Sequence, residues 1–510
     1  MPACLFRLFL PLLAVTVLTT PLWANYSRPN IILIIADDLG YSDLSAYGNI
    51  HLHTPFIDEL EKDGIRFTQA YATAPICGPS RAAIMTGRYQ QRFGNEFMPF
   101  DVATQEVTKQ LKRNYLEPWQ KTEGMKMLRP HMLMNRSKYR TGLPANEVTI
   151  AQLLQKNGYA TGLVGKWNLG NGDGRYPDQC GYDYSYYFPG ALTRYVDDPV
   201  DKNRYVSQHL PWSFSELPAW APRAAATAIY EGRRLVRDTG YLTFSFAEKA
   251  ISFLEKNKND PFFLTLAFNA PHDPFQAPIA NYNRIQNVDD RVKRVYYAMI
   301  EALDDAVGEV LQQLKETGNT ENTLIIFISD NGGATYTRAT DNAPLRGGKC
   351  TQFDGGLRVP MFLQYPKEIR GGQTYQRPVS SLDIFTTIAA AAHIPLPANR
   401  SYDGVDLLTC LKHPDSTPHR TLYFRNGYTK AIRKDNWKLY INEHDKETFL
   451  FDLSNDPSEL KDLSHDRKEI VDDLKKDLAN WEKTQTINPL WPSAADIIIT
   501  ENGHRRYFPS

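Results

Sequence analysis

Asn30-Ile31-Ile32-Leu33-Ile34-Ile35-Ala36-Asp37-Asp38 is a continuous apolar run that ends in two carboxylates. A run without polar alternation is typical of a strand buried on both faces, as in a parallel sheet. Three further runs end in the same way: 161–164 leads to Lys166, 262–268 to His272, and 324–328 to Asp330-Asn331. Helix-like segments at 149–157, 242–258 and 291–317 separate these runs. The sequence therefore predicts an α/β domain with a mixed, mostly parallel sheet flanked by helices, and a site beyond the carboxyl ends of its strands.

Two of these strand ends carry residues that suit a hard metal ion. Asp37, Asp38, Asp330 and Asn331 together offer three carboxylates and one amide oxygen. Either pair alone is also typical of a turn or a helix cap. Oxygen ligands of this kind suit Ca²⁺ or Mg²⁺ and do not suit Zn²⁺. The pattern thus predicts a site for one hard divalent cation.

A second informative stretch begins at Cys77. The run Cys77-Gly78-Pro79-Ser80-Arg81 has the form C-x-P-S-R, and Thr86-Gly87-Arg88 follows at a fixed distance. A free cysteine is often no more than a small buried hydrophobic residue. Proline, however, suits the first turn of a helix, and a helix N-terminus favours an anion. The stretch therefore places a nucleophile and an arginine one helical turn apart at a potential anion site.

These motifs occur in the order found in type I, formylglycine-dependent sulfatases, and the chain resembles that family. The resemblance rests on Asp37-Asp38, the Cys77 stretch, Gly165-Lys166-Trp167, Ala270-Pro271-His272, Asp330-Asn331-Gly332-Gly333 and Leu345-Arg346-Gly347-Gly348-Lys349. It extends from about Pro29 into the C-terminal part of the chain. It implies an alkaline-phosphatase-like fold, a bound Ca²⁺ ion and the hydrolysis of sulfate esters, with carbohydrates as substrates.

The resemblance also implies a role for each matching residue. Asp37, Asp38, Asp330 and Asn331 would hold the calcium ion, together with Cys77 after its oxidation to formylglycine (3-oxoalanine) by a formylglycine-generating enzyme. The hydrated aldehyde would attack sulfur and form a covalent intermediate. Arg81 would neutralise the diol and the metal cluster. Lys166 and Lys349 would bind the sulfate oxygens, and His272 would donate a proton to the leaving alcohol.

Asn168 departs from the family pattern. The family motif Gly-Lys-Trp-His-Leu-Gly reads Gly165-Lys166-Trp167-Asn168-Leu169-Gly170 here, and the usual histidine takes a proton as sulfate is eliminated. Asn168 can hydrogen-bond the second diol hydroxyl but cannot accept its proton near neutral pH. Three outcomes follow: another base such as Asp330 or a water serves, the second step is slower, or the protein binds sulfated ligands without turnover. The first is favoured because every other element of the site is present.

The sequence as a whole divides into three predicted segments. Residues 1–24 resemble a signal peptide, which predicts a periplasmic or secreted protein that does not stay in the membrane after cleavage. Residues 25–400 form the predicted catalytic domain. Residues 401–510 form a predicted small α+β domain with strands at 430–433 and 437–441, a turn at Asp435-Asn436 and a helix at 468–483.

The charge composition limits the classes of molecule that the protein is expected to bind. The chain has 510 residues with 58 basic and 58 acidic side chains, so no net charge attracts it to nucleic acid. The segment 105–140 nevertheless carries nine Lys or Arg and three Glu, which suits either a solvated insertion or a wall facing a polyanion. With the export signal and the many aromatic residues, this favours a sulfated polysaccharide, either a carrageenan-like galactan or a glycosaminoglycan.

Three alternatives stay open from the sequence. A phosphonate or phosphodiester hydrolase could use the same fold and modified cysteine, and a non-catalytic glycan-binding protein would fit Asn168. One disulfide among Cys180, Cys350 and Cys410 is also possible, but their spacing does not select a pair.

Overall fold

The structure is a computed structural model that describes residues 28–99, 125–126, 141–170, 172, 174–197, 203–210, 223–413, 416–493, 496–501 and 504–510. The predicted signal peptide at 1–24 lies outside these residues. So does the basic segment 105–140, apart from the backbone of strand β3 (Met125–Lys126).

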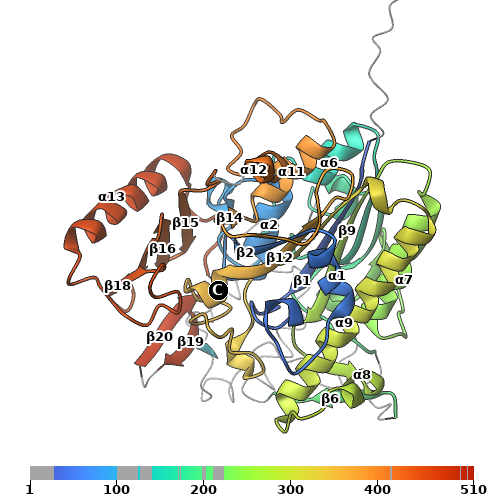
Figure 1. The fold of residues 1–510 in the computed structure, drawn as a ribbon, viewed down its shortest axis with the longest axis horizontal. Coiled ribbons are helices and arrows are strands. Elements are labelled where there is room, and N and C mark those ends of the chain that lie inside the picture. Colours follow the sequence, from blue (N-terminus) through green and yellow to red (C-terminus); the bar gives the residue numbers. More distant parts are fainter. Residues whose placement is uncertain are drawn as a thin grey trace, which may run out of the picture.

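A large twisted sheet forms the centre of the molecule (Figure 1). Among the described residues it has 11 strands. Their order is β13 (Gln373–Tyr375), β2 (Ile65–Tyr71), β12 (Arg358–Gln364), β11 (Thr323–Ser329), β1 (Asn30–Asp37), β9 (Phe262–Pro271), β4 (Ala160–Lys166), β5 (Tyr184–Phe188), β7 (Ile229–Glu231) and β8 (Arg234–Val236), with β14 (Val379–Ser380) paired to β2. The four strands predicted from apolar runs are β1, β4, β9 and β11, and they are neighbours in this sheet.

The pairing of these four strands is parallel throughout, as predicted. β1 pairs with β11 on one side and β9 on the other, and β4 continues the parallel series beyond β9. Antiparallel pairing begins at β12 on one side and at β7 on the other. The mixed, mostly parallel sheet is therefore confirmed.

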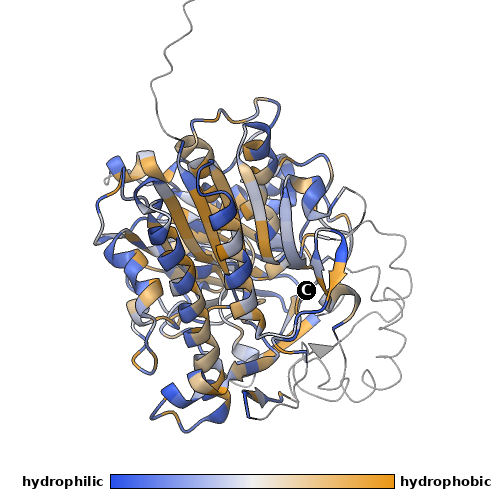
Figure 2. Ribbon diagram, turned by 90° about the vertical axis from the view of Figure 1, so that its right-hand side faces the viewer, coloured by the Kyte–Doolittle hydropathy of each residue, from blue (hydrophilic) through white to orange (hydrophobic). Residues whose placement is uncertain are grey.

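Helices cover both faces of this sheet (Figure 1). On one face lie α1 (Pro55–Lys62), α7 (Leu242–Lys256) and α9 (Arg291–Glu316), and on the other α2 (Cys77–Thr86), α6 (Ile150–Lys156), α11 (Asp383–Ala391) and α12 (Leu407–Lys412). The central strands carry hydrophobic residues along their length while the helices alternate (Figure 2). The three predicted helices correspond to α6, α7 and α9.

Smaller elements complete the catalytic region. α8 (Ile279–Arg284) and α10 (Asp354–Leu357) are short helices, and β6 (Tyr205–Gln208) pairs with β10 (Phe275–Pro278). Thr149 caps α6 with its side-chain oxygen and Gln152 returns a bond to the Thr149 backbone, so this helix start is fixed by a capping box.

The C-terminal part has its own antiparallel sheet, as predicted. It consists of β15 (Thr421–Asn426), β16 (Thr429–Lys434), β17 (Trp437–Asn442) and β18 (Glu447–Asp452), and α13 (Lys468–Gln485) packs on it. The turn at Asp435-Asn436 lies between β16 and β17. A hairpin of β19 (Asp496–Glu501) and β20 (His504–Pro509) follows. The domain boundary at residue 400 remains a prediction.

Cys77, Cys180, Cys350 and Cys410 are all free thiols in the structure, so the possible disulfide does not form. No helix in the described part of the chain combines the length and the apolar character needed to cross a bilayer.

Candidate active site

The carboxyl ends of four parallel strands bring the predicted residues together. Asp37 is the last residue of β1, Lys166 is the last of β4, and Asp330 comes directly after β11. His272 comes directly after β9. Because these strands are parallel neighbours, their ends open on one edge of the sheet. The convergence predicted from the sequence is therefore present.

Each of the three aspartates has a basic partner. Lys166 Nζ donates to Asp37 Oδ2 at 2.7 Å, and Lys349 Nζ donates to Asp38 Oδ2 at 2.8 Å. Arg81 Nε donates to Asp330 Oδ2 at 2.7 Å. All six side chains are buried. Three negative and three positive charges balance here, which is the arrangement in which buried charges are tolerated.

The charges also affect one another's protonation. Burial lowers the pKa of Lys349, but Asp38, Cys77, Tyr336 and Asp37 together outweigh it, and the pKa lies well above its usual value. Burial and Lys349 likewise lower the pKa of His272. Asp38, Asp37 and the hydrogen bond with Asp273 act in the opposite direction, and the His272 pKa lies well above 6.5. The carboxylates thus favour the charged form of each group, although Lys349 Nζ and His272 Nε2 lie 2.9 Å apart and share one hydrogen bond.

The donor atoms fit a hard cation. Single ligand atoms of Asp37, Asp38, Cys77 and His272 all lie within 4.8 Å of one another. Asn331 Nδ2 donates to Asp38 Oδ1 at 2.8 Å, while the buried Asn331 Oδ1 accepts no hydrogen bond from any described residue. A buried amide oxygen without a partner, on a side chain that binds Asp38, can serve as an oxygen ligand for a cation such as Ca²⁺.

Asp330 is placed differently from the other predicted ligands. It does not belong to the group of converging ligand atoms around Asp37 and Asp38. Its Oδ2 is bound by Arg81, and its Oδ1 accepts the backbone N–H of Asp38 at 3.3 Å. Its assignment as a metal ligand remains a prediction.

Cys77 begins helix α2 and is buried. A Cβ atom at the adjacent Gly78 would lie 2.7 Å from Pro99 Cδ and 3.5 Å from the carbonyl oxygen of Asn168. Glycine at position 78 therefore allows Pro99 to approach the start of the helix, while the Asn168 carbonyl lies at ordinary contact distance. A similar constraint acts at Gly165, whose φ is +113° and where a Cβ would lie 1.9 Å from Ala267 O. This close approach sets the direction in which the following Lys166 leaves β4.

Asn168 lies two residues beyond the end of β4, with its carbonyl oxygen near the start of α2. It is buried, its φ is +52°, and its Nδ2 has no hydrogen-bond partner among the described residues. An asparagine tolerates this left-handed conformation better than most residues. A buried amide nitrogen without a partner is an exception that usually has a functional or structural reason.

Several residues of the site were not predicted. His272 Nδ1 lies 2.9 Å from Asp273 Oδ1, and Tyr195 Oη donates to the carbonyl oxygens of Asn269 and His272 at 2.6 and 2.8 Å. Met98 Sδ accepts the backbone N–H of Gly78 at 3.5 Å. Tyr195 lies in a loop without periodicity, so the sequence contained no signal for it. Asp273 could have been found as the neighbour of His272.

A helix N-terminus, buried cations and converging carboxylates together suit the binding of an anionic ester. A sulfatase family model matches residues 29–394, and a model for the C-terminal region of N-sulphoglucosamine sulphohydrolase matches 348–484. The first covers well over half of the sequence. The chain belongs to the sulfatase family and is an enzyme that hydrolyses sulfate esters.

Individual relatives agree with this assignment. Human arylsulfatase D is 29% identical over 95% of this chain and 91% of its own length. Mouse N-acetylgalactosamine-6-sulfatase is 28% identical over 88% and 84%, respectively. The crystal structure of Ps i-CgsB in complex with k-i-k-neocarrahexaose is 32% identical, with a TM-score of 0.75 over 91% of this chain and 94% of that one.

Proposed function

We propose that this sulfatase removes sulfate from a sulfated carbohydrate, and that residue 77 acts as formylglycine beside one Ca²⁺ ion. The observation that carries the mechanism is the balanced set of three carboxylates and three buried cations around Cys77. The carbohydrate substrate is supported by two relatives: one is named for N-acetylgalactosamine, and the other has a neocarrahexaose bound.

In this proposal Asp37, Asp38, Asp330 and Asn331 hold the metal ion. When bound, the ion and the hydrated aldehyde supply an electrophile for the sulfate oxygens and a nucleophile for sulfur. Lys166, which contacts Asp37, and Lys349, which contacts Asp38, bind the sulfate oxygens. Arg81 keeps the buried carboxylates charged, because it stays protonated at every relevant pH.

His272 donates the proton that the departing sugar hydroxyl needs. Its Nδ1 is oriented by Asp273, and its Nε2 faces the cluster, 2.9 Å from Lys349 Nζ and 3.5 Å from Asp38 Oδ2, so a substrate would have to replace the contact with Lys349. A histidine fixed through one nitrogen presents the other in a defined direction. Conversion of Cys77 requires a formylglycine-generating enzyme in the same host, and the N-terminal segment is expected to direct export.

The first test is the chemical state of residue 77. We expect peptide mass spectrometry of active enzyme to find the aldehyde in place of the thiol, and Cys77→Ala to abolish sulfate release while thermal unfolding is unchanged. Chelation should lower activity and Ca²⁺ should restore it. Full activity of Cys77→Ala would refute the nucleophile, and stoichiometric Zn²⁺ would refute the metal.

The second test is the substrate. A panel of sulfated galactan and glycosaminoglycan oligosaccharides, beside aryl sulfate, aryl phosphate and phosphonate esters, separates the alternatives. We expect the highest kcat/KM on a sulfated oligosaccharide. Faster turnover of phosphonate or phosphodiester than of every sulfate ester would favour the other hydrolase class.

A further inference from the structure

Tyr195 places one hydroxyl group against the backbone of His272. Its Oη atom lies 2.6 Å from the carbonyl oxygen of Asn269 and 2.8 Å from that of His272, so a single proton is shared between two acceptors. The N–H of His272 also donates to the Asn269 carbonyl oxygen, at 3.0 Å. The hydroxyl therefore binds both ends of the tight turn that leads from β9 into His272.

Tyr195 is itself held firmly in the core. It is fully buried, its N–H donates to Gln276 Oε1 at 3.0 Å, and its carbonyl oxygen accepts the N–H of Leu242 at 2.8 Å. Its ring stacks on that of Tyr241, with the centroids 5.4 Å apart and an interplanar angle of 23°. Burial raises the pKa of Tyr195 well above 10, so the hydroxyl stays a donor at neutral pH. A side chain fixed in this way also fixes the carbonyl groups that it binds.

The carbonyl groups bound by Tyr195 bear on the direction of the His272 imidazole. The His272 carbonyl belongs to the planar peptide unit that joins His272 to Asp273. The imidazole Nδ1 lies 2.6 Å from the carbonyl oxygen of Asp273 and 2.9 Å from its Oδ1. The orientation of that peptide unit therefore determines where Asp273 meets the ring. By holding the peptide unit, Tyr195 helps to direct Nε2 toward the carboxylate cluster.

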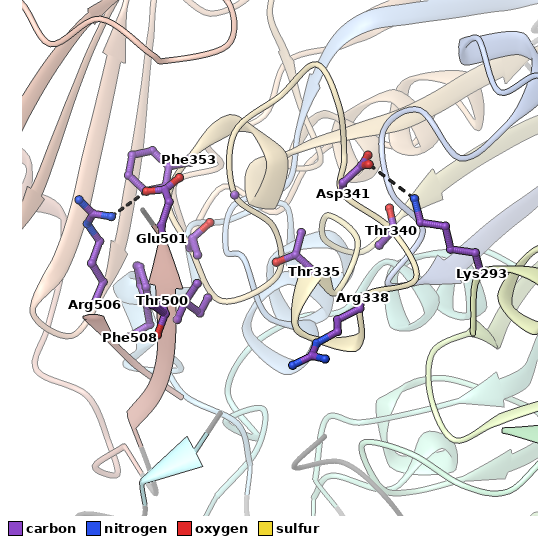
Figure 3. A pocket seen from close by; sticks show the side chains of 13 residues that line it. Lys293, Thr335, Arg338, Thr340, Asp341, Phe353, Thr500, Glu501, Arg506 and Phe508 are labelled. Carbon is purple, nitrogen blue, oxygen red and sulfur yellow. Dashed lines mark hydrogen bonds and ion pairs between the residues drawn. The ribbon is translucent and has the colours of Figure 1, made fainter. Parts of the chain in front are cut away.

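The contact at the other end of the imidazole cannot align it during the reaction. Lys349 Nζ lies 2.9 Å from His272 Nε2. Lys349 comes from a loop whose residues Gly347 and Thr351 line a cavity of about 340 Å³, shown in Figure 3. A sugar oxygen that takes the proton from Nε2 must displace Lys349 from that nitrogen. At that moment the alignment of the ring depends on its backbone side, where Tyr195 lies.

We propose that Tyr195 is a positioning residue, which aligns His272 for proton donation through the carbonyl oxygens of Asn269 and His272. The inference rests on the proposed role of His272 as the proton donor. As the bond between sulfur and the sugar oxygen breaks, the proton on Nε2 passes to that oxygen and the imidazole becomes neutral. A residue that acts only through His272 matters only where the leaving group needs this proton.

The first test varies the leaving group. A sulfated oligosaccharide leaves as an alcohol that needs the proton, whereas 4-nitrophenyl sulfate leaves as a phenolate that is stable without it. We measure alcohol release in a single turnover with saturating enzyme, so that later sulfate release does not enter. Tyr195→Phe should slow the oligosaccharide reaction about 10- to 100-fold, because a misplaced catalytic group costs up to about 10²-fold. The rate with 4-nitrophenyl sulfate should stay near the wild-type value.

Tyr241→Phe is the matched control. Tyr241 is buried, and its Oη donates to the carbonyl oxygen of Gln276 at 2.9 Å, four residues beyond His272. The two substitutions therefore remove the same atom from the same kind of contact. Both should lower the thermal unfolding temperature to a similar extent, but Tyr241→Phe should keep the wild-type rates on both substrates. An equal loss of the oligosaccharide rate in the two variants would mean that general loosening is responsible, and would overturn the proposal.

A double-mutant cycle separates this inference from the function on which it rests. His272→Ala should slow alcohol release from the oligosaccharide by about 10²–10⁴-fold and affect 4-nitrophenyl sulfate much less. Tyr195→Phe added to His272→Ala should cause no further loss, because its effect passes through the imidazole. Phenyl sulfate, whose phenol is a poorer leaving group than 4-nitrophenol, replaces the oligosaccharide if no sulfated sugar is hydrolysed.

The outcomes of the cycle are distinct. If His272→Ala slows both substrates alike, proton donation by His272 is refuted and the positioning role falls with it. If His272→Ala behaves as expected, two results refute the positioning role alone. One is an unchanged oligosaccharide rate in Tyr195→Phe, and the other is a further loss when the two substitutions are combined.

Discussion

Lys438→Met should destabilise the protein far more than Lys434→Met, although the two lysines make ion pairs of equal length. Lys438 Nζ lies 2.6 Å from Asp354 Oδ1, and Lys434 Nζ lies 2.6 Å from Asp477 Oδ2. The Lys438 and Asp354 side chains are 0% and 1% exposed, whereas those of Lys434 and Asp477 are 36% and 37% exposed. The two substitutions therefore differ mainly in the burial of the ion pair that they remove.

The expected magnitudes follow from that difference. Lys438 also binds Glu459 Oε1 at 2.8 Å, so its removal leaves two buried carboxylates without their direct ion-pair partner. Removing one partner of a buried pair costs about 3–5 kcal/mol, while an exposed pair contributes about 0–1 kcal/mol. Burial raises the pKa of Glu459 to about 7 even with Lys438 present, so protonation should reduce the loss at lower pH.

Lys438→Met should also affect the active site. Asp354 begins α10, and the next residue, Gly355, donates its N–H to Arg346 O at 2.8 Å. Arg346 in turn belongs to the loop that carries Lys349. Urea unfolding at pH 7.5, with kcat/KM measured on the same samples, gives both readouts. Equal shifts of the unfolding midpoint in the two variants, or a loss below about 1 kcal/mol in Lys438→Met, would refute the argument from burial.

Two further predictions concern single residues. Asn168→His should speed sulfate release relative to alcohol release in rapid-mixing experiments, since a missing general base costs about 10²–10⁴-fold in its step. Equal release rates of alcohol and sulfate in wild type, with no gain in the variant, would mean that another group already acts as the base. Burial raises the pKa of Asp304 to about 8, which the N–H groups of Ile57 and Phe56 only partly offset. The folded state then binds more protons than the unfolded state between about pH 4 and pH 8, so stability should fall as pH rises through that window. Asp304→Asn should remove this fall between pH 6 and pH 9 in urea unfolding, and an unchanged slope would contradict it.

The sequence predicted the centre of the sheet because burial on both faces removes polar alternation. It did not predict β12, which lies between β11 and β2. This strand contains Pro360, and proline in a run argues against a central strand. The structure accommodates it at an irregularity, since the pairing with β2 shifts register between Val359 and Met361. A local exception of this kind depends on the neighbouring strand, which a single sequence does not identify.

The site residues also differ in whether the sequence could predict them. Residues that directly follow apolar strands, such as Asp37 and Asp330, could be predicted because strand ends meet at one edge. Tyr195 could not, because its contacts with Asn269 and His272 join segments about 75 residues apart. The contacts between the C-terminal part and the Lys349 loop could not be predicted from the sequence either. It depends on Arg346 bonding to Glu501 and to the Glu459 carbonyl, more than 100 residues away.

The structure around Asn168 helps to select the group that replaces the missing histidine. The motif alone left Asp330 and a water as substitutes for the missing histidine. Asp330 already accepts from Arg81 Nε and from the Asp38 N–H, so a proton taken there would break a buried ion pair. The Asn168 Nδ2 group, in contrast, has a free donor position among the described residues. A water bound to that donor would keep its own lone pair available for the proton of the second diol hydroxyl. A water oriented by Asn168 is therefore favoured over Asp330 as the substitute, and because water is a weaker base than imidazole the elimination step stays slow.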